Sequence, residues 1–246
     1  MNSTITQEFK IKDHIVYELC IETTKLLKGQ QKALRKIKWT HGESNIDTEY
    51  CELACNCCKM AWCMIKQKYP KYTDVKIVCS IPDINIVFVY PNGEKENKKI
   101  ELKSSKSLKM PGSTIGKLDI NQPLIYCLRS SQNSDVFEVR CSQYHNAMWE
   151  SKTDLFQDRT PRPFINFEKM KDPDNVLPFE NKSKKYWIEH YAKCAINRIS
   201  GAILHRSSWQ NEMIKIIKRN IIEDYIRKTP IEQIKKHKKI LKLKNN

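Results

Sequence analysis

The hydrophobic period of the chain changes at Pro70, and this change limits the possible folds more than any other feature. Residues 48–69 repeat apolar side chains at helical spacing, and Pro70 ends that pattern. After Pro70 the apolar residues follow the period of strands, at residues 75–79, 84–90, 99–103, 123–128 and 136–141. One helix followed by several strands predicts an α/β (α+β) protein with a mixed central β-sheet flanked by helices.

Helical patterns also stand on either side of this central part. Residues 5–36 predict one or two amphipathic helices, and residues 186–240 predict a helical C-terminal region with breaks near Gly201 and at Pro230. We therefore expect three segments packed into one compact domain. They are an N-terminal helical segment at 1–46, a core at 47–145 and a basic, mainly helical region at 146–246.

The charge of the chain indicates its partner. The 246 residues include 44 Lys and Arg against 28 Asp and Glu, a net charge of +16, while 40% are hydrophobic and can build a core. Residues 181–246 hold 17 of the basic residues and five acidic ones. Such a balance favours a polyanion such as nucleic acid as the partner, although the terminal run of lysines is also typical of a plain solvated tail.

The chain carries no segment that predicts export or insertion into a membrane. Its first residues lack a basic stretch followed by an apolar one, and no window approaches the roughly 18 apolar residues of a membrane helix. Ten cysteines in so long a chain, five of them within residues 51–63, favour reduced thiols over a disulfide framework. We expect an intracellular, soluble protein without a membrane partner.

The residues that predict chemistry are Asp83, Glu101 and Lys103. Asp83 follows Pro82 at the start of one predicted strand, and Glu101 and Lys103 lie in the next. Residues two apart on a strand project to one face, so Glu101 and Lys103 share a face while Leu102 points into the core. If the strands are neighbours, Asp83 and Glu101 converge on one hard cation, with the Leu102 backbone carbonyl as a further ligand.

A divalent ion held by oxygen ligands suits the hydrolysis of a nucleic-acid backbone. It polarises the phosphodiester and activates water, and a neighbouring ammonium stabilises charge on the phosphate. Each half of the pattern by itself is common in turns and on exposed strands. Their combination in a chain of +16 predicts a nuclease site.

With these residues the chain resembles the PD-(D/E)xK nuclease superfamily, here Pro82-Asp83 and Glu101-Leu102-Lys103. The resemblance covers about residues 47–145. Within the superfamily the chain looks most like type II restriction endonucleases, and the stretch IELKSSKSLKMPGSTIGKLDINQPLIYCLR is similar to those encoded by large DNA viruses of algae.

The resemblance implies a restriction-endonuclease-like core that cuts DNA with Mg²⁺ and leaves 5′-phosphates. Asp83 and Glu101 are then metal ligands and Lys103 is the catalytic lysine. A further acidic ligand often comes from the preceding helix, where Glu52 is the candidate and Glu49 stands behind it, although a surface role is equally open to both. A viral enzyme of this kind acts inside the host cell.

Several basic residues are candidates for contact with double-stranded DNA. Lys106, Lys109 and Lys117 follow the strand with Glu101, in a loop that is equally consistent with a plain connector. Arg159 and Arg162 lie in a proline-rigid loop, and arginine suits bidentate recognition of guanine, but phosphate contact or simple exposure is also open to them. A duplex with two strands to cut favours a homodimer.

The cysteines of residues 51–63 suggest zinc at first sight. However, Cys51, Cys55, Cys58 and Trp62 recur at the spacing of one buried helix face, and structural zinc normally uses separated CxxC pairs. We therefore predict that they pack in the core. For His145, which has no second histidine at a suitable distance, we predict a role at the surface or against DNA.

Two rival functions stay open at this point. One is a structure-specific or repair nuclease of the same fold. The other is a non-catalytic basic DNA-binding protein, in which Asp83, Glu101 and Lys103 are ordinary charges of the sheet. A basic binder accounts for the net charge but has no need of a convergent pair of carboxylates.

Overall fold

The computed structural model describes most of the first 183 residues and a few beyond them. The described residues are 13–37, 39, 48–72, 74–80, 83–114, 118–129, 136–153 and 163–183, with residues 185, 186, 189, 192, 212, 215, 216, 219 and 220.

A five-stranded mixed β-sheet forms the centre of the structure, as the sequence predicted. Its strand order is β1-β2-β3-β5-β6, and all neighbours are antiparallel except β3 and β5, which are parallel. Each strand lies where the period of two indicated one. The bounds are β1 (Asp74–Ser80), β2 (Asp83–Val89), β3 (Lys95–Ser105), β5 (Pro123–Arg129) and β6 (Phe137–Gln143).

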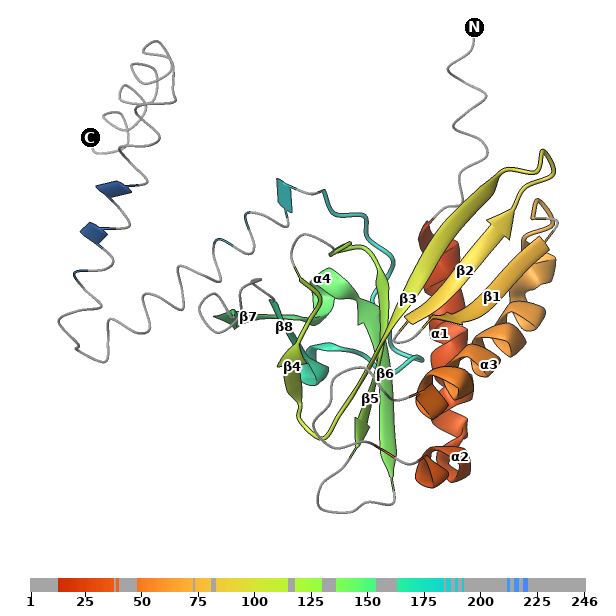
Figure 1. The fold of residues 1–246 in the computed structure, drawn as a ribbon, viewed down its shortest axis with the longest axis horizontal. Coiled ribbons are helices and arrows are strands. Elements are labelled where there is room, and N and C mark those ends of the chain that lie inside the picture. The colour runs from red at the N-terminus through yellow and green to blue at the C-terminus, as the bar shows by residue number, and fades with distance from the viewer. Residues whose placement is uncertain are drawn as a thin grey trace, which may run out of the picture. The chain divides into compact units, whose positions relative to one another are not determined.

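Two helices, α1 (Asp13–Gly29) and α3 (Thr48–Ile65), pack against one face of this sheet (Figure 1). Strand β2 explains why, because Ile84, Ile86 and Phe88 are fully buried while the residues between them are half-buried. The buried set joins both helices in one hydrophobic core. Helix α2 (Gln31–Lys36) follows α1, and the 3₁₀ helix η1 (Lys66–Lys68) extends α3 as far as the predicted break at Pro70.

Helix α1 buries a stripe of residues at helical spacing that includes two hydroxyl groups. Thr23 and Thr24 are fully buried, and their hydroxyls donate to the backbone oxygens of Leu19 and Cys20 at 2.7 Å. These bonds satisfy polar groups that would otherwise be costly to bury. The stripe therefore packs against α3 and the sheet without losing hydrogen bonds.

A second, three-stranded sheet lies against the other face of the central sheet (Figure 1). It consists of β4 (Lys109–Pro111), β8 (Pro163–Asn166) and β7 (Met148–Thr153), together with α4 (Tyr144–Ala147) and the 3₁₀ helix η3 (Phe167–Lys169). Tyr126 from β5 packs on Phe167 in the small core between the layers. We had predicted a mainly helical segment from residue 146, so residues 148–153 and 163–166 differ from that expectation. Strands β4 and β8, with three and four residues, are too short for a period of two to be recognised.

A tight turn joins β2 to β3. The Tyr90 N–H donates to the Glu94 oxygen at 3.0 Å, and the Gly93 N–H donates to the Tyr90 oxygen at 2.9 Å. Gly93 adopts a φ of 82°, a left-handed conformation that glycine takes without steric cost. The short turn extends β3 to eleven residues, more than the five predicted.

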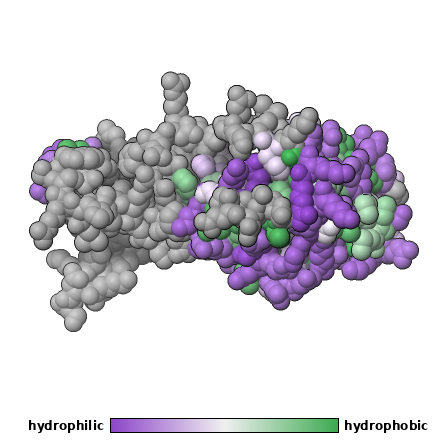
Figure 2. All heavy atoms as spheres, turned by 90° about the horizontal axis from the view of Figure 1, so that it is seen from below, coloured by the Kyte–Doolittle hydropathy of each residue, from purple (hydrophilic) through white to green (hydrophobic). Residues whose placement is uncertain are grey.

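By its internal contacts the chain divides into two compact units, residues 1–193 and 194–246. The described residues between 185 and 220 are helical, in agreement with the predicted C-terminal helices, and the rest of that region lies outside the described residues. On the face drawn in Figure 2, hydrophilic residues dominate the described surface and apolar residues form only small patches. Among the described residues, no helix has the length and apolar character needed to cross a bilayer.

Candidate active site

Asp83, Glu101 and Lys103 lie on two neighbouring antiparallel strands. Asp83 is the first residue of β2, while Glu101 and Lys103 belong to β3. Because Ile84 is paired with Ile100, the same register places Asp83 opposite Glu101. The face that they share is the one turned away from α1 and α3, and Leu102 packs in the core on the helical side. The structure thus brings together the three residues that the sequence singled out.

Glu101 is the most buried of the three and has two donors on one oxygen. Its residue is 3% exposed. The Nζ atom of Lys103 lies 2.7 Å from Oε1 of Glu101, and the Ser113 hydroxyl donates to the same oxygen at 2.8 Å. Within the described residues no donor is seen on Oε2. Both of these donors therefore hold the carboxylate through the same oxygen, Oε1.

Asp83 holds a buried oxygen that nothing in the described chain satisfies. Its Oδ1 atom is buried without a hydrogen-bond partner among the described residues. Burial raises the pKa of Asp83 above its ordinary value, and the negative charge of Glu101 raises it further. Lys103, Lys99 and the Leu102 backbone N–H act in the opposite direction without cancelling the rise. An unsatisfied carboxylate oxygen beside a second carboxylate is an arrangement that a cation would stabilise.

The loop that carries Ser113 is held in place by its neighbours. The Gly112 N–H donates to the Pro163 oxygen at 2.7 Å, and the Ser113 N–H donates to the hydroxyl of the fully buried Tyr144. A Cβ atom on Gly112 would lie 1.9 Å from that hydroxyl and 2.9 Å from the Pro163 oxygen. Only glycine allows the backbone to come this close to Tyr144 and Pro163. The close approach positions the next residue, Ser113, to donate its hydrogen bond to Glu101.

The acidic residues predicted as a further metal ligand, Glu49 and Glu52, do not join Asp83 and Glu101. Glu49 and Glu52 are exposed, and among the described residues no three His, Cys, Asp or Glu side chains form a group that could hold a metal ion. Glu52 therefore does not join Asp83 and Glu101 in the structure. The Leu102 carbonyl is not tested as a ligand, and its role stays a prediction.

The predicted DNA-contacting residues are only partly described. Lys106 is exposed directly after β3, and Lys109 is half-buried in β4, so the loop after β3 begins as a strand of the second sheet. Neither is shown to contact the site. Outside the described residues lie Pro82, Lys117, Arg159, Arg162 and the basic run from Lys235 onward.

Two residues near the carboxylates were missed in the sequence. Ser113 could not be foreseen because its contact with Glu101 depends on how the second sheet folds back. Lys99 is exposed on β3, and its charge lowers the pKa of Asp83. The alternation of Lys99, Glu101 and Lys103 at a spacing of two was a signal that could have found it.

The cysteines of α3 pack as the helical spacing predicted. Cys51, Cys55, Cys57 and Cys58 are buried, and Trp62 packs against the same core. Cys63 is exposed. The interpretation as a core face is therefore confirmed for Cys51, Cys55 and Cys58.

His145 is buried, which corrects the prediction that it lies at the surface. It is 4% exposed, with Nδ1 3.0 Å from the Asn146 side-chain oxygen and Nε2 3.2 Å from the Glu180 backbone oxygen. Burial lowers its pKa below the ordinary value of histidine. The Glu180 backbone and the Tyr186 ring, which meets it edge-on, come from a distant part of the chain, and the sequence did not indicate these contacts.

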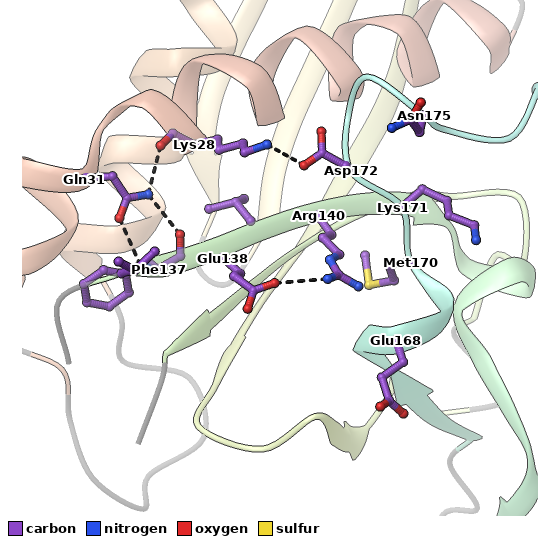
Figure 3. Close-up of a pocket in the computed structure, with 12 residues that line it drawn as sticks. Lys28, Gln31, Phe137, Glu138, Arg140, Glu168, Met170, Lys171, Asp172 and Asn175 are labelled. Atoms are coloured by element: carbon purple, nitrogen blue, oxygen red, sulfur yellow. Dashed lines mark hydrogen bonds and ion pairs between the residues drawn. The ribbon is translucent and has the colours of Figure 1, made fainter. Parts of the chain in front are cut away.

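A cavity of about 680 Å³ lies along the β6 edge and is drawn in Figure 3. Four of its charged side chains are paired, since Lys28 pairs with Asp172 and Arg140 lies 3.0 Å from Glu138, and Glu168 and Lys171 line it as well. The amide of Gln31 donates to the Phe137 oxygen at 2.9 Å and accepts from the Phe137 N–H at 3.0 Å, which caps part of the strand edge. Asp83, Glu101 and Lys103 are not among the residues that line it, so this cavity is separate from the candidate site.

Comparison of the chain with protein-family models, with curated proteins and with solved structures finds no match. The arrangement of Asp83, Glu101 and Lys103 is accordingly the observation from which a function can be argued.

Proposed function

We propose that this protein is a Mg²⁺-dependent type II restriction endonuclease, which hydrolyses phosphodiester bonds of double-stranded DNA at a short specific sequence and leaves 5′-phosphates. One observation carries the proposal. Asp83 and Glu101 stand opposite each other on adjacent strands, Asp83 Oδ1 is buried without a partner among the described residues, and Lys103 Nζ lies 2.7 Å from Glu101.

The two carboxylates fit a hard divalent cation. Mg²⁺ takes oxygen ligands and is commonly held by only one or two carboxylates, with waters and substrate phosphates completing its shell. Asp83 Oδ1 and Glu101 Oε2 are the oxygens that would hold it. The absence of a third acidic ligand among the described residues is therefore compatible with Mg²⁺. When bound, the ion supplies Lewis-acid polarisation of the phosphodiester and activation of water.

The remaining groups act on the phosphate and on the carboxylates. Lys103 is 16% exposed at its side chain, which leaves its ammonium able to meet an incoming phosphate while Glu101 keeps it oriented. A cation fixed beside the scissile phosphate stabilises the charge that develops there. Ser113 holds Glu101 from the other side. Lys99, exposed on β3, and Lys106, exposed directly after it, add positive charge that suits contact with neighbouring phosphates.

The net charge of +16 supports DNA as the substrate. Phosphate contacts by lysine and arginine supply most of the sequence-independent affinity of DNA-binding proteins. A non-catalytic binder would show the same charge. It would gain nothing from a pair of opposed carboxylates, which repel phosphate unless a cation lies between them.

A plasmid cleavage assay with the full chain tests the proposal. Supercoiled plasmid is incubated with the protein in Mg²⁺, in Ca²⁺ and in chelator, and the products are separated on a gel. We expect discrete bands in Mg²⁺ alone, because Ca²⁺ accepts the oxygen ligands but activates water less well. The variants D83N, E101Q and K103A should each lose cleavage while keeping their fold and their affinity for DNA.

Matched controls make the assay specific. Lys76 is exposed on β1 and Glu52 is exposed on α3, so K76A and E52Q should cut like the wild type. Near-normal cutting by D83N, E101Q or K103A would refute the site. Random nicking would favour a structure-specific or repair nuclease, and binding without any cutting would favour a non-catalytic DNA-binding protein.

A further inference from the structure

Two thiols from separate elements meet behind the strand that carries Asp83. Cys51 lies in the first turns of α3, and Cys79 lies near the end of β1. Their sulfur atoms are 2.8 Å apart. The Cys51 thiol also points toward the backbone oxygen of Asp83 at 3.7 Å. A contact this close between two sulfurs requires only a small movement to become a bond, since a disulfide has a sulfur separation of about 2.05 Å.

The pair combines close contact with access from solvent. Cys51 is buried at 2% exposure, whereas Cys79 is half-buried, so that part of this residue meets solvent. A second pair provides the contrast, because Cys20 and Cys141 are also hydrogen-bonded to each other but are both 0% exposed. Only the first of these two pairs therefore joins proximity to accessibility.

We propose that Cys51 and Cys79 form a reversible disulfide when the protein meets a low-molecular-weight disulfide such as oxidised glutathione. The Cys79 thiol loses its proton to solvent, and its sulfur attacks one sulfur of the reagent. One glutathione leaves and takes up a proton. The Cys51 sulfur then attacks the Cys79 sulfur of the mixed disulfide, and the second glutathione leaves as a thiolate that takes up the proton given up by the Cys51 thiol. Two protein thiols are oxidised by two electrons, and one small disulfide is reduced to two thiols.

The cross-link would tie α3 to β1 beside the start of β2. The two cysteines are 28 positions apart, so the bond closes a loop that includes most of α3 and the whole connection to the sheet. Closing a loop of this size restricts the unfolded chain and stabilises the folded one. It also removes the thiol proton that Cys51 directs at the Asp83 backbone oxygen. The proposed disulfide would therefore cross-link α3 and β1 close to Asp83. This inference does not depend on the reaction that the carboxylates perform.

Peptide mapping of the full chain tests the disulfide. The protein is incubated with oxidised glutathione, its remaining thiols are blocked by alkylation, and it is digested with trypsin without reduction. We expect residues 39–59 to be joined to residues 77–95 in most molecules, with fragmentation locating the bond at Cys51 and Cys79. Reduction should separate the two peptides. The exposed Cys63 should carry a glutathione adduct, which shows that the oxidant was active.

Single substitutions provide the matched controls. C51S and C79S should abolish the linked peptide, whereas C55S, which removes the next thiol on the same helix face, should leave it intact. In the wild type, oxidation should raise the melting temperature, on the order of 10 °C for a loop of this size. Reduction should reverse the rise.

Failure of the linked peptide to form while Cys63 becomes modified would overturn the proposal, as would a bond located at Cys55. Because the mapping is done on the wild type, it does not depend on the variants being folded. Neither readout involves DNA cleavage, so this result and the result of the plasmid assay are independent.

Discussion

At the scale of single residues, Asp83 is charged at a cost to stability. Burial and the neighbouring Glu101 raise its pKa, so the folded state binds the proton of Asp83 more tightly than the unfolded state does. A group with a raised folded pKa stabilises the protein below its unfolded pKa. That contribution is lost as the pH rises through the folded pKa. Above the folded pKa of Asp83 and without metal, the ionised carboxylate therefore destabilises the fold.

This sign leads to a prediction for D83N. In chelator at pH 7 the variant should melt higher than the wild type, by a few degrees if each kcal/mol shifts the melting temperature by about 3 °C in a unit of this size. The difference should shrink as the pH falls through the folded pKa of Asp83, because the wild-type side chain is then neutral too. Thermal denaturation followed by circular dichroism measures both. A melting temperature of D83N below that of the wild type, at pH 7 and also below the folded pKa of Asp83, would contradict the prediction.

The same variant tests metal binding without any substrate. Mg²⁺ at about 100 times its dissociation constant should stabilise the wild type by about 2.7 kcal/mol, because it binds the folded state only. D83N should gain much less, since it lacks one of the two carboxylates. The melting temperature at increasing Mg²⁺ checks this, with E52Q as a control that should respond like the wild type.

Ser113 is a positioning residue for Glu101. Replacement by alanine removes the donor at 2.8 Å and leaves Lys103 alone on that oxygen. Loss of a partner that orients a metal ligand typically costs about 10- to 100-fold in activity or metal affinity. We expect S113A to need more Mg²⁺ for half-maximal cleavage, and S113T, which keeps the hydroxyl, to recover. An unchanged Mg²⁺ requirement in S113A would show that the contact does not matter.

At the scale of elements, the second sheet supports the site through one glycine. The chain passes from β4 to Ser113 by way of Gly112, where a Cβ atom would collide with Tyr144 and approach Pro163. The parallel pairing of β3 with β5 requires a crossing connection, and this connection is the segment that delivers Ser113 to Glu101. The packing of β4 against β8 thus determines the geometry of a carboxylate in another sheet.

We predict that G112A destabilises the protein by about 1 to 3 kcal/mol, the usual cost of forcing extra atoms into a packed site. The midpoint of urea unfolding should fall without a change in slope. Gly29 is the matched control, because it ends α1 and a Cβ there would meet nothing within 4 Å. G29A should be neutral or stabilising by up to about 1 kcal/mol. Equal effects of the two substitutions would argue against the close approach at Gly112.

At the scale of the whole molecule, the positive charge is unevenly distributed. Residues 181–246 hold 17 of the 44 basic residues and only five acidic ones, and the last twelve residues include Lys235, Lys236, Lys238, Lys239, Lys242 and Lys244. Lysines that contact phosphates neutralise charge, whereas sequence is read by contacts to base edges. The terminal run should therefore contribute to affinity and not to sequence preference.

Removal of residues 235–246 should weaken binding to all DNA sequences alike. Each phosphate contact contributes about 0.9 to the slope of log K against log salt, so the slope should flatten by up to about five units if all six lysines engage. Titrations at several salt concentrations, with a specific and a scrambled duplex, measure this. An unchanged slope would show that the tail does not touch DNA, and a change of cleavage sequence would place the recognition element in the tail.

Much of the central sheet could be predicted from the sequence because its strands are long enough to show a period. β2 alternates cleanly between buried and half-buried residues, and the register that follows from it brings Asp83 opposite Glu101. The cysteine face of α3 was equally readable, since three cysteines and Trp62 recur at helical spacing. Whether Glu52 could reach the site depended on which face of α3 carries it, and the sequence did not show this. The structure places Glu52 on the exposed face.

The sequence by itself determined which residues share a face, because the periods of strand and helix are local properties of the backbone. It thereby grouped Glu101 with Lys103 and placed Asp83 on the neighbouring strand. Only the tertiary structure decided which groups from distant segments meet that face. Ser113 reaches Glu101 through the folding of the second sheet, Cys79 reaches Cys51 through the docking of α3, and His145 is buried where it meets the Glu180 backbone. These contacts depend on long-range packing, which has no period along the chain and leaves no local signal.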